Sequence, residues 1–193
     1  MLFRSQPETA RGVRRSPLHD RLAARGACFG EVAGWERTNW FAPEGVTPQY
    51  EYSYGRQNWY AYCAEECAAV RTNVAMFDQS SFGKFVLEGA DAESVLNQIC
   101  ANDVSVPVGK LVYTQWLNER GGIEADVTIT REALDRYLIV TAAATQVRDF
   151  AWLKDHIPAG ARAVAVDVTS GQATLSMMGP NSRALLQGLT HAD

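Results

Sequence analysis

Alternation of hydrophobic and polar residues dominates the chain from residue 82 onward. Strict alternation is typical of strands that bury one face, whereas apolar positions three or four residues apart are typical of helices. These patterns predict strands over 82–89, 110–117, 123–130, 137–143, 162–169 and 173–179, and helices over 58–74, 91–100, 145–157 and 181–189. Asp91 and Asn181 are the predicted N-caps of two of these helices. Hairpins with interleaved helices indicate an α+β fold with a largely antiparallel sheet and packed helices.

Two segments depart from this alternation. The apolar run over 137–143 hardly alternates, so we expect that strand to be more buried than its neighbours. Residues 1–57 look irregular and hold Pro7, Pro17, Pro43 and Pro48 beside a dense aromatic run. A disordered linker does not carry so many aromatic residues. We therefore expect this segment to wrap a surface, either of its own chain or of a partner.

The strand over 123–130 carries two carboxylates. Its apolar residues alternate with Glu124, Asp126, Thr128 and Thr130. Successive side chains of a strand point to opposite faces, so one face is core and the other is polar. Two interpretations stay open: the polar face meets water, or it lines a cavity. Glu124 is nearer the turn, and we expect it to be the wetter of the two acids.

The partner of Asp126 across the hairpin depends on the loop length. A loop over 118–121 places Tyr113 opposite Asp126, and a loop over 118–122 places Thr114 there. Opposed side chains lie about 5 Å apart, which is close enough to share one ligand. An aromatic ring beside a carboxylate suits a flat, nitrogen-rich heterocycle. The sequence leaves the register open, since Gly121-Gly122 permits either turn.

Composition and charge exclude several classes of function. The net charge of −4 does not favour a nucleic-acid partner. No apolar run reaches the roughly 18–20 residues that a membrane helix needs, so we expect no membrane partner. The Arg-rich residues 1–25 are typical either of a mitochondrial transit segment or of an exposed arm. We expect a cytoplasmic protein, with the mitochondrial matrix as the alternative.

Other chemistry finds little support in the sequence. The chain has four cysteines, and Cys63 and Cys67 share a helix face, but a zinc ion needs two more ligands nearby. We therefore expect no metal site and reduced, packed thiols. No phosphate-binding loop, dinucleotide fingerprint or nucleophile elbow is present.

Three stretches together resemble the aminomethyltransferase, or glycine-cleavage T-protein, family. They are "AVRTNVAMFDQSSFGKFVLEGADAESVLNQICANDV" (69–104), "GKLVYTQWLNERGGIEADVTITR" (109–131) and "MMGPNSRALL" (177–186). The chain is more similar to sarcosine and dimethylglycine dehydrogenases, which carry this domain at their C-terminus. The reason is "RSPLHDRLAARGACFGEVAGWERTNWFAP" (15–43), which resembles a connector that the free T-protein lacks. The resemblance covers roughly residues 15–193.

The resemblance implies a domain organisation and a function. Residues 1–57 would be the arm that connects to a missing flavin domain, and 58–193 the first part of a truncated folate-binding domain. In this family the flavin half, with FAD, oxidises a small N-methyl amine to its iminium product. The T-protein-like half binds tetrahydrofolate and captures the one-carbon unit as methylenetetrahydrofolate. The expected partners are folate, the amine or iminium, and a flavin domain.

The same resemblance implies the site residues. Asp126 matches the essential aspartate of the family strand, although Ala125 replaces its acidic neighbour. Tyr113 matches the folate-contacting tyrosine, and Phe82 falls where the free T-protein has a methionine over the ligand. Thr128 and Thr141 occupy further wall positions, and Thr141 replaces an asparagine that is common in the free T-protein.

The sequence lacks the flavin half and also the later T-protein block, which in the family carries a pterin-anchoring glutamate. Two further interpretations therefore remain open. The chain then resembles a fragment from the middle of a longer enzyme. One alternative is a non-catalytic folate-binding relative, such as the tRNA-modification proteins built on this fold. The other is a docking module without catalysis, in which the aromatic N-terminal segment binds a partner.

Overall fold

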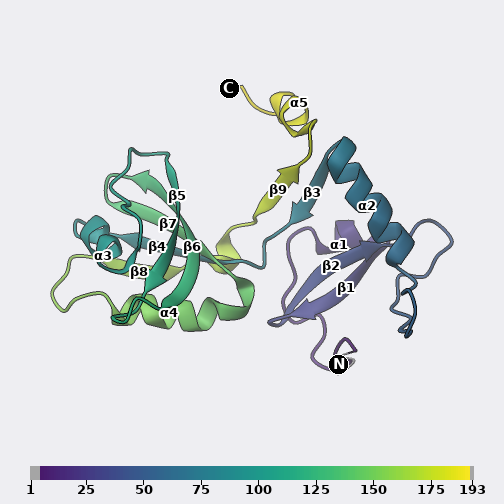
Figure 1. Ribbon diagram of the computed structural model, residues 1–193, viewed down its shortest axis with the longest axis horizontal. Helices are drawn as coiled ribbons and strands as arrows, with labels where there is room; N and C mark the ends of the chain where they lie inside the picture. The colour runs from purple at the N-terminus through teal and green to yellow at the C-terminus, as the bar shows by residue number, and fades with distance from the viewer. Residues whose placement is uncertain (1–4, 192–193) are drawn as a thin grey trace. The chain divides into compact units, whose positions relative to one another are not determined.

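The computed structural model describes residues 5–191. The chain forms two units: one combines the residues up to Ser81 with those from Ala173 onward, and the other is Phe82–Gln172. Figure 1 labels their elements along the chain. The division into a 1–57 arm and a 58–193 domain stays a prediction.

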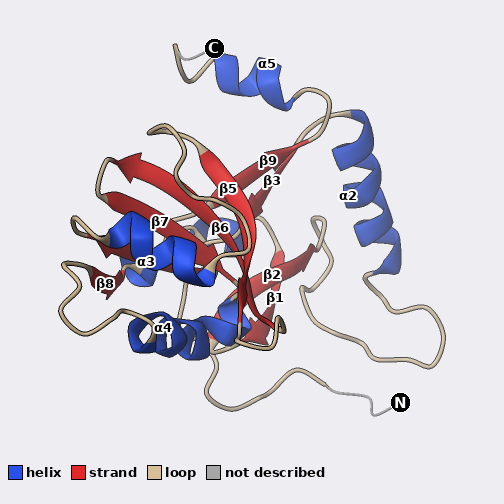
Figure 2. Cartoon of the chain, turned by 60° about the vertical axis from the view of Figure 1, so that its left-hand side comes forward, coloured by secondary structure: helices blue, strands red, loops and turns tan. Residues whose placement is uncertain are grey.

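The second unit is built on a five-stranded sheet of order β5-β6-β7-β4-β8. All four neighbouring pairs are antiparallel. The strands are β4 (Gly83–Glu88), β5 (Leu111–Leu117), β6 (Ile123–Ala133), β7 (Arg136–Thr141) and β8 (Val164–Asp167). Figure 2 shows the strands in red with the helices in blue. The predicted α+β fold with an antiparallel sheet is confirmed.

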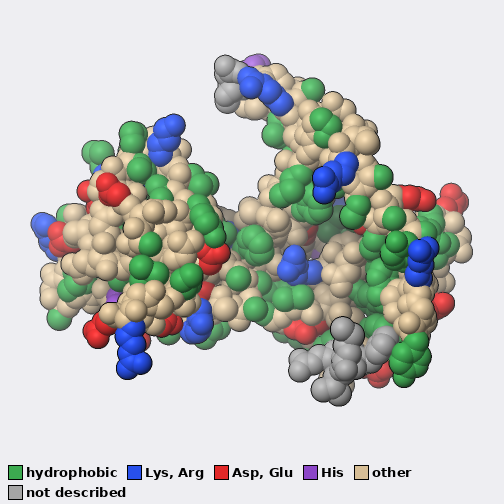
Figure 3. All heavy atoms as spheres, viewed as in Figure 1, with side chains coloured by type: hydrophobic (Ala, Val, Ile, Leu, Met, Phe, Trp, Pro, Cys, Tyr) green, Lys and Arg blue, Asp and Glu red, His purple; other side chains and the backbone are tan. Residues whose placement is uncertain are grey.

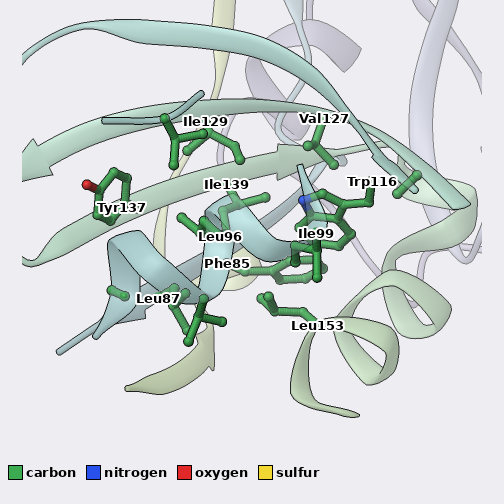
Figure 4. Packing of buried hydrophobic residues seen from close by; sticks show 14 residues of the cluster. Phe85, Leu87, Leu96, Ile99, Trp116, Val127, Ile129, Tyr137, Ile139 and Leu153 are labelled. Carbon is green, nitrogen blue, oxygen red and sulfur yellow. The ribbon is translucent and has the colours of Figure 1, made fainter. Parts of the chain in front are cut away.

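Two helices cover one face of this sheet. They are α3 (Ala92–Ile99) and α4 (Gln146–Asp155), and the short turns η1 (Ala143–Thr145) and η2 (Thr169–Gly171) lie in the connections. The core joins them to the strands through Phe85, Leu87, Leu96, Ile99, Trp116, Val127, Ile129, Tyr137, Ile139 and Leu153 (Figure 4). Burying these side chains supplies the main driving force for folding of this unit. The residues that alternate with them on β5 and β6 face away from the helices.

The expectation that the strand over 137–143 is more buried than the two strands before it is confirmed. β7 has no exposed residue, whereas β5 and β6 both have some. Its fully buried residues are Tyr137, Ile139 and Thr141, which alternate with half-buried ones because helices cover only one face of the strand. Asp91 occupies the predicted N-cap position of α3, but its side chain makes no capping hydrogen bond. Its carboxylate instead accepts hydrogen bonds from Arg162 N at 2.8 Å and Arg162 Nη2 at 2.9 Å.

The first unit contains more regular structure than the sequence predicted. Its elements are α1 (His19–Ala23), β1 (Ala27–Val32), β2 (Trp35–Phe41), α2 (Tyr60–Thr72), β3 (Ala75–Asp78), β9 (Leu175–Met178) and α5 (Ser182–Gln187). β1 and β2 form an antiparallel hairpin inside the segment that we expected to be irregular. Its turn is Ala33-Gly34, both with positive φ, as tight hairpin turns require. Polar and apolar residues do not alternate in these strands, which hid them from pattern analysis.

A second small sheet pairs β3 with β9, which lie almost a hundred residues apart in the sequence. The strand β9 was predicted and β3 was not. Several apolar side chains of this ribbon are exposed, among them Met76, Phe77, Leu175 and Met178. Asn181 precedes α5 without a capping bond, and its Nδ2 donates to Asn73 Oδ1 over 3.0 Å. Asn181 therefore occupies the predicted N-cap position without making the side-chain capping hydrogen bond.

Several further properties bear on the classes of function. On the face shown in Figure 3, basic and acidic side chains are interspersed. Among residues 5–191, no helix is both long enough and apolar enough to cross a bilayer. The same residues contain no cluster of three or more His, Cys, Asp or Glu side chains arranged to hold a metal ion. All four cysteines are free, and Cys67 is exposed rather than packed as expected.

Candidate functional site

Four polar side chains lie together on the face of β5 and β6 that the helices leave uncovered. Gln115 is opposite Asp126 in the ladder, and Tyr113 is opposite Thr128. Both registers proposed for Asp126 were therefore wrong. The reason is an irregularity between Trp116 and Leu117: the loop over 118–122 is present, with Leu117 opposite Ile123, but the pairing then shifts by one residue.

Asp126 receives a hydrogen bond on each carboxylate oxygen. Tyr113 Oη donates to Asp126 Oδ2 over 2.7 Å, and Gln115 Nε2 donates to Oδ1 over 3.0 Å. The hydrogen bond to Asp126 raises the pKa of the Tyr113 hydroxyl above its ordinary value, because ionising the phenol would break this bond and also place a second negative charge beside the carboxylate. Tyr113 is 57% exposed and Asp126 is exposed as well. The pair is thus held in place while remaining open to a ligand.

Glu124 and Asp126 differ in exposure in a way opposite to expectation. Glu124, predicted to be the wetter one, is half-buried, and Asp126 is exposed. Asn118 Nδ2 donates to Glu124 Oε1 over 2.7 Å, which ties Glu124 back to the hairpin turn. Glu124 therefore belongs to the turn, while Asp126 is the acid presented on the open face.

Thr141 does not join the Asp126 face. Its side chain is 4% exposed on the helix-covered side of β7, where Oγ1 donates to Asp149 Oδ2 over 2.5 Å. Thr145 Oγ1 donates to the same oxygen over 2.6 Å. The position of Thr141 therefore does not support the predicted role of its side chain in lining the folate site. Its hydroxyl instead donates a hydrogen bond to the buried carboxylate of Asp149 on α4.

Phe82 comes directly before β4 and is half-buried. β7 separates β4 from β6, which places the two strands about 10 Å apart at the usual strand spacing. The buried side chain of Lys84, on β4, donates from Nζ to the Phe82 carbonyl over 2.9 Å. Phe82 thus precedes a strand that is separated from Asp126 on β6 by the whole of β7.

The sequence matches the GCVT N-terminal domain over residues 18–193. The chain therefore belongs to the GCVT N-terminal domain family. This domain name refers to the T-protein of the glycine cleavage system, so the resemblance inferred from the quoted motifs is confirmed. The match includes the hairpin that carries Tyr113 and Asp126.

Relatives of this GCVT N-terminal domain include enzymes of N-methyl amine metabolism. The chain is 50% identical over 188 residues to a 4-methylaminobutanoate oxidase (formaldehyde-forming) of Paenarthrobacter nicotinovorans, with 97% of the chain and 23% of the oxidase covered. It is 33% identical over 226 residues to human mitochondrial sarcosine dehydrogenase, with 97% and 25% covered. The chain thus spans about a quarter of the length of these relatives.

A solved structure supports the same fold. The glycine cleavage system aminomethyltransferase T of Bartonella henselae superimposes with a TM-score of 0.75 at 25% identity. The superposition covers 91% of this chain and 43% of that protein. The aminomethyltransferase fold of the GCVT N-terminal domain is therefore established for most of the chain.

Sequence reasoning missed one member of this face, Gln115. It occupies the alternate position two residues after Tyr113, so strand periodicity places both on one face. The β6 partner of Gln115 depends on the register, which the sequence left open. Asp126, Tyr113 and Thr128 are brought together by the ladder, whereas Phe82 and Thr141 are not.

Proposed function

We propose that this GCVT N-terminal domain binds tetrahydrofolate on the face formed by Tyr113, Gln115, Asp126 and Thr128. The longer protein would oxidise a small N-methyl amine in an FAD-containing half and deliver the one-carbon unit to this domain, giving methylenetetrahydrofolate. The observation that carries the proposal is the exposed Asp126 carboxylate, held by Tyr113 and Gln115 at 2.7 and 3.0 Å.

The donor and acceptor set of this face fits a reduced pterin. Each oxygen of the Asp126 carboxylate keeps acceptor capacity beyond the one internal bond, so Asp126 can accept N–H groups of a ligand. The exposed ring of Tyr113 offers a flat surface beside it. Two internal donors fix the carboxylate in advance, which lowers the entropy lost on binding.

Asp126 would act through its charge. Tetrahydrofolate, when bound, supplies the nucleophilic nitrogens that take up the one-carbon unit. A carboxylate beside such a nitrogen stabilises the positive charge that develops during attack, and this stabilisation grows when the site is closed from water. The Asp126 carboxylate would also accept the proton that must leave, which is general-base catalysis.

A second candidate function is favoured by the name of the Paenarthrobacter relative. That oxidase is called formaldehyde-forming, and it shares 50% identity with this chain. If the longer protein acts in the same way, the one-carbon unit would leave as formaldehyde. This domain would then bind folate without capturing carbon, or would only dock a flavin-containing half. The polar face would then be a solvated surface.

Measurement of both products in the full-length protein separates these functions. With an N-methyl amine and tetrahydrofolate present, we expect methylenetetrahydrofolate to form, and Asp126→Asn to divert the carbon to formaldehyde while amine oxidation continues. The matched control is Glu119→Gln, an exposed acid in the same hairpin, which should change neither product. Formaldehyde as the sole product of the unmodified protein would reject folate capture and favour the second candidate.

One of the relatives bears on the compartment of the longer protein. The sarcosine dehydrogenase relative is named as mitochondrial, which favours the matrix alternative over the cytoplasm for the longer protein. We propose folate, the amine or its iminium and a flavin-containing portion as partners, and FAD as a cofactor held outside this chain.

A further inference from the structure

The hairpin that presents Asp126 contains a bulge at Glu124. Leu117 is opposite Ile123 at the turn, yet the next residue on β5, Trp116, is opposite Ala125. Glu124 is therefore the extra residue of β6. Such a bulge disrupts the ladder locally and re-aims the side chains that follow it.

The bulge decides which face of the sheet receives Asp126. Continuing the turn register without it would place Asp126 opposite Thr114, whose side chain is fully buried on the helix-covered face. A one-residue shift of register transfers every side chain of a strand to the other face. With the bulge, Asp126 lies opposite Gln115 and beside Tyr113, while Ala125 and Val127 enter the core.

A bulge needs partners for the backbone groups that leave the ladder. The pairing of β6 with β7 begins only at Thr128 and Val140, so the carbonyl of Glu124 lies beyond it. Arg148 Nη2, from α4, donates a hydrogen bond to this carbonyl oxygen. The guanidinium therefore takes the position that a neighbouring strand would occupy, and it joins the helix to the extra residue.

Arg148 is itself held in place by a buried carboxylate. Its Nε and Nη2 donate to Asp149 Oδ1 over 3.1 and 3.0 Å. Asp149 is 1% exposed, and its other oxygen accepts the hydroxyls of Thr141 and Thr145. The Arg148 side chain is 59% exposed, but its guanidinium is held by hydrogen bonds to the buried Asp149 carboxylate.

We propose that Arg148 is a positioning residue for Asp126: anchored by Asp149, it fixes the bulge at Glu124 and thereby the face on which Asp126 meets Tyr113 and Gln115. This inference deepens the proposed function, because it names what orients the acid assigned to folate. The juxtaposition itself does not depend on folate.

Titration of Tyr113 tests the position of Asp126 directly. In the chain labelled with ¹³Cζ-tyrosine, NMR reports the pKa of each phenol, and that of Tyr113 is raised by Asp126. In Arg148→Met we expect the pKa of Tyr113 to fall toward its ordinary value of about 10. Arg120→Met, an exposed arginine in the same hairpin, is the matched control and should leave the pKa of Tyr113 unchanged.

A second variant guards against a folding defect, because Arg148→Met leaves the buried Asp149 without its cation. Arg148→Met combined with Asp149→Asn removes that charge and should lower the pKa of Tyr113 in the same way. An unchanged Tyr113 pKa in a folded form of either variant would overturn the proposal.

Tetrahydrofolate affinity, measured by calorimetry on the full-length protein, adds the functional consequence. We expect Arg148→Met to weaken binding at least tenfold, with Arg148→Lys restoring part of it, since an ammonium can still reach one acceptor. If the unmodified protein binds no folate, the proposed function fails, while the tyrosine titration still decides the role of Arg148. Unchanged affinity in Arg148→Met, where the unmodified protein binds, would count against the positioning role.

Discussion

Tyr113 and Asp126 share a hydrogen bond of 2.7 Å although they are diagonal, not opposite, neighbours in the β5–β6 ladder. The phenol spans the diagonal because diagonal pairs lie within reach of aromatic side chains. Gln115, directly opposite Asp126, holds the other carboxylate oxygen. The carboxylate of Asp126 is therefore held from two sides on an exposed surface.

The first prediction concerns the ionisation of Tyr113. Because Asp126 raises the pKa of Tyr113, the hydrogen bond is present below that pKa and is lost as the pH rises through it. Asp126→Asn removes the neighbouring charge, so the pKa of Tyr113 should fall toward about 10. NMR titration of labelled tyrosines measures this, with Glu119→Gln as the control. A Tyr113 pKa that stays raised in Asp126→Asn would show that another group causes the shift.

The second prediction concerns the carboxylate buried beneath the sheet. Thr141→Val deletes a hydroxyl that donates to Asp149, leaving part of that buried group without a partner. We expect a loss of about 1–3 kcal/mol in the free energy of unfolding. Thr130→Val, on the opposite face of the sheet, should change it by less than about 0.5 kcal/mol. Urea denaturation compares the two, and equal losses would contradict the assigned role of Thr141.

The third prediction concerns acid stability of the first unit. Glu36, 8% exposed, accepts hydrogen bonds from Arg11 Nε and Nη2 and from Gly12 N. Arg11 lowers the pKa of Glu36, so this stabilisation is present above the unfolded-state pKa near 4.5 and is lost as the pH falls through the folded-state pKa.

Glu36→Gln should therefore destabilise the chain by about 1.5–3 kcal/mol at pH 7, and the difference from the unmodified protein should shrink below about pH 4. Thermal unfolding across this pH range provides the measurement. Glu44→Gln, an exposed acid nearby in the sequence, should have little effect at any pH. A pH-independent difference for Glu36→Gln would mean that packing, not charge, is responsible.

The fourth prediction compares two glycines with positive φ. Gly89 has φ of 138°, and a Cβ there would lie 2.0 Å from the carbonyl oxygen of Arg162. Gly109 has φ of 87° with open space around it. Gly109→Ala should cost about 1–2 kcal/mol from backbone strain alone. Gly89→Ala adds the clash with the Arg162 carbonyl and should lower the free energy of unfolding by clearly more. Denaturation midpoints of the two variants provide the measurement. Similar losses of stability in both variants would mean that the backbone around Gly89 relaxes to remove the clash.

Periodic segments of the second unit were predictable because their environment repeats along the chain. The strand around Val127 and the helix around Leu96 bury one face against a single core, so the spacing of their apolar residues indicates their structure. The strands β1 and β2 escaped prediction, since their burial does not alternate strictly. β3 escaped because its pairing with β9 joins segments almost a hundred residues apart.

The α+β class and the aminomethyltransferase family could be predicted from the sequence alone, because they depend on local spacing and on quoted motifs such as that around Asp126. Only the tertiary structure decided what Asp126 faces. A single extra residue, Glu124, shifts the pairing of β6 with β5 by one position, so Asp126 changes face. Arg148, on helix α4, donates a hydrogen bond to the backbone carbonyl of Glu124. Register is set by such long-range contacts, which leave no periodic trace in the chain.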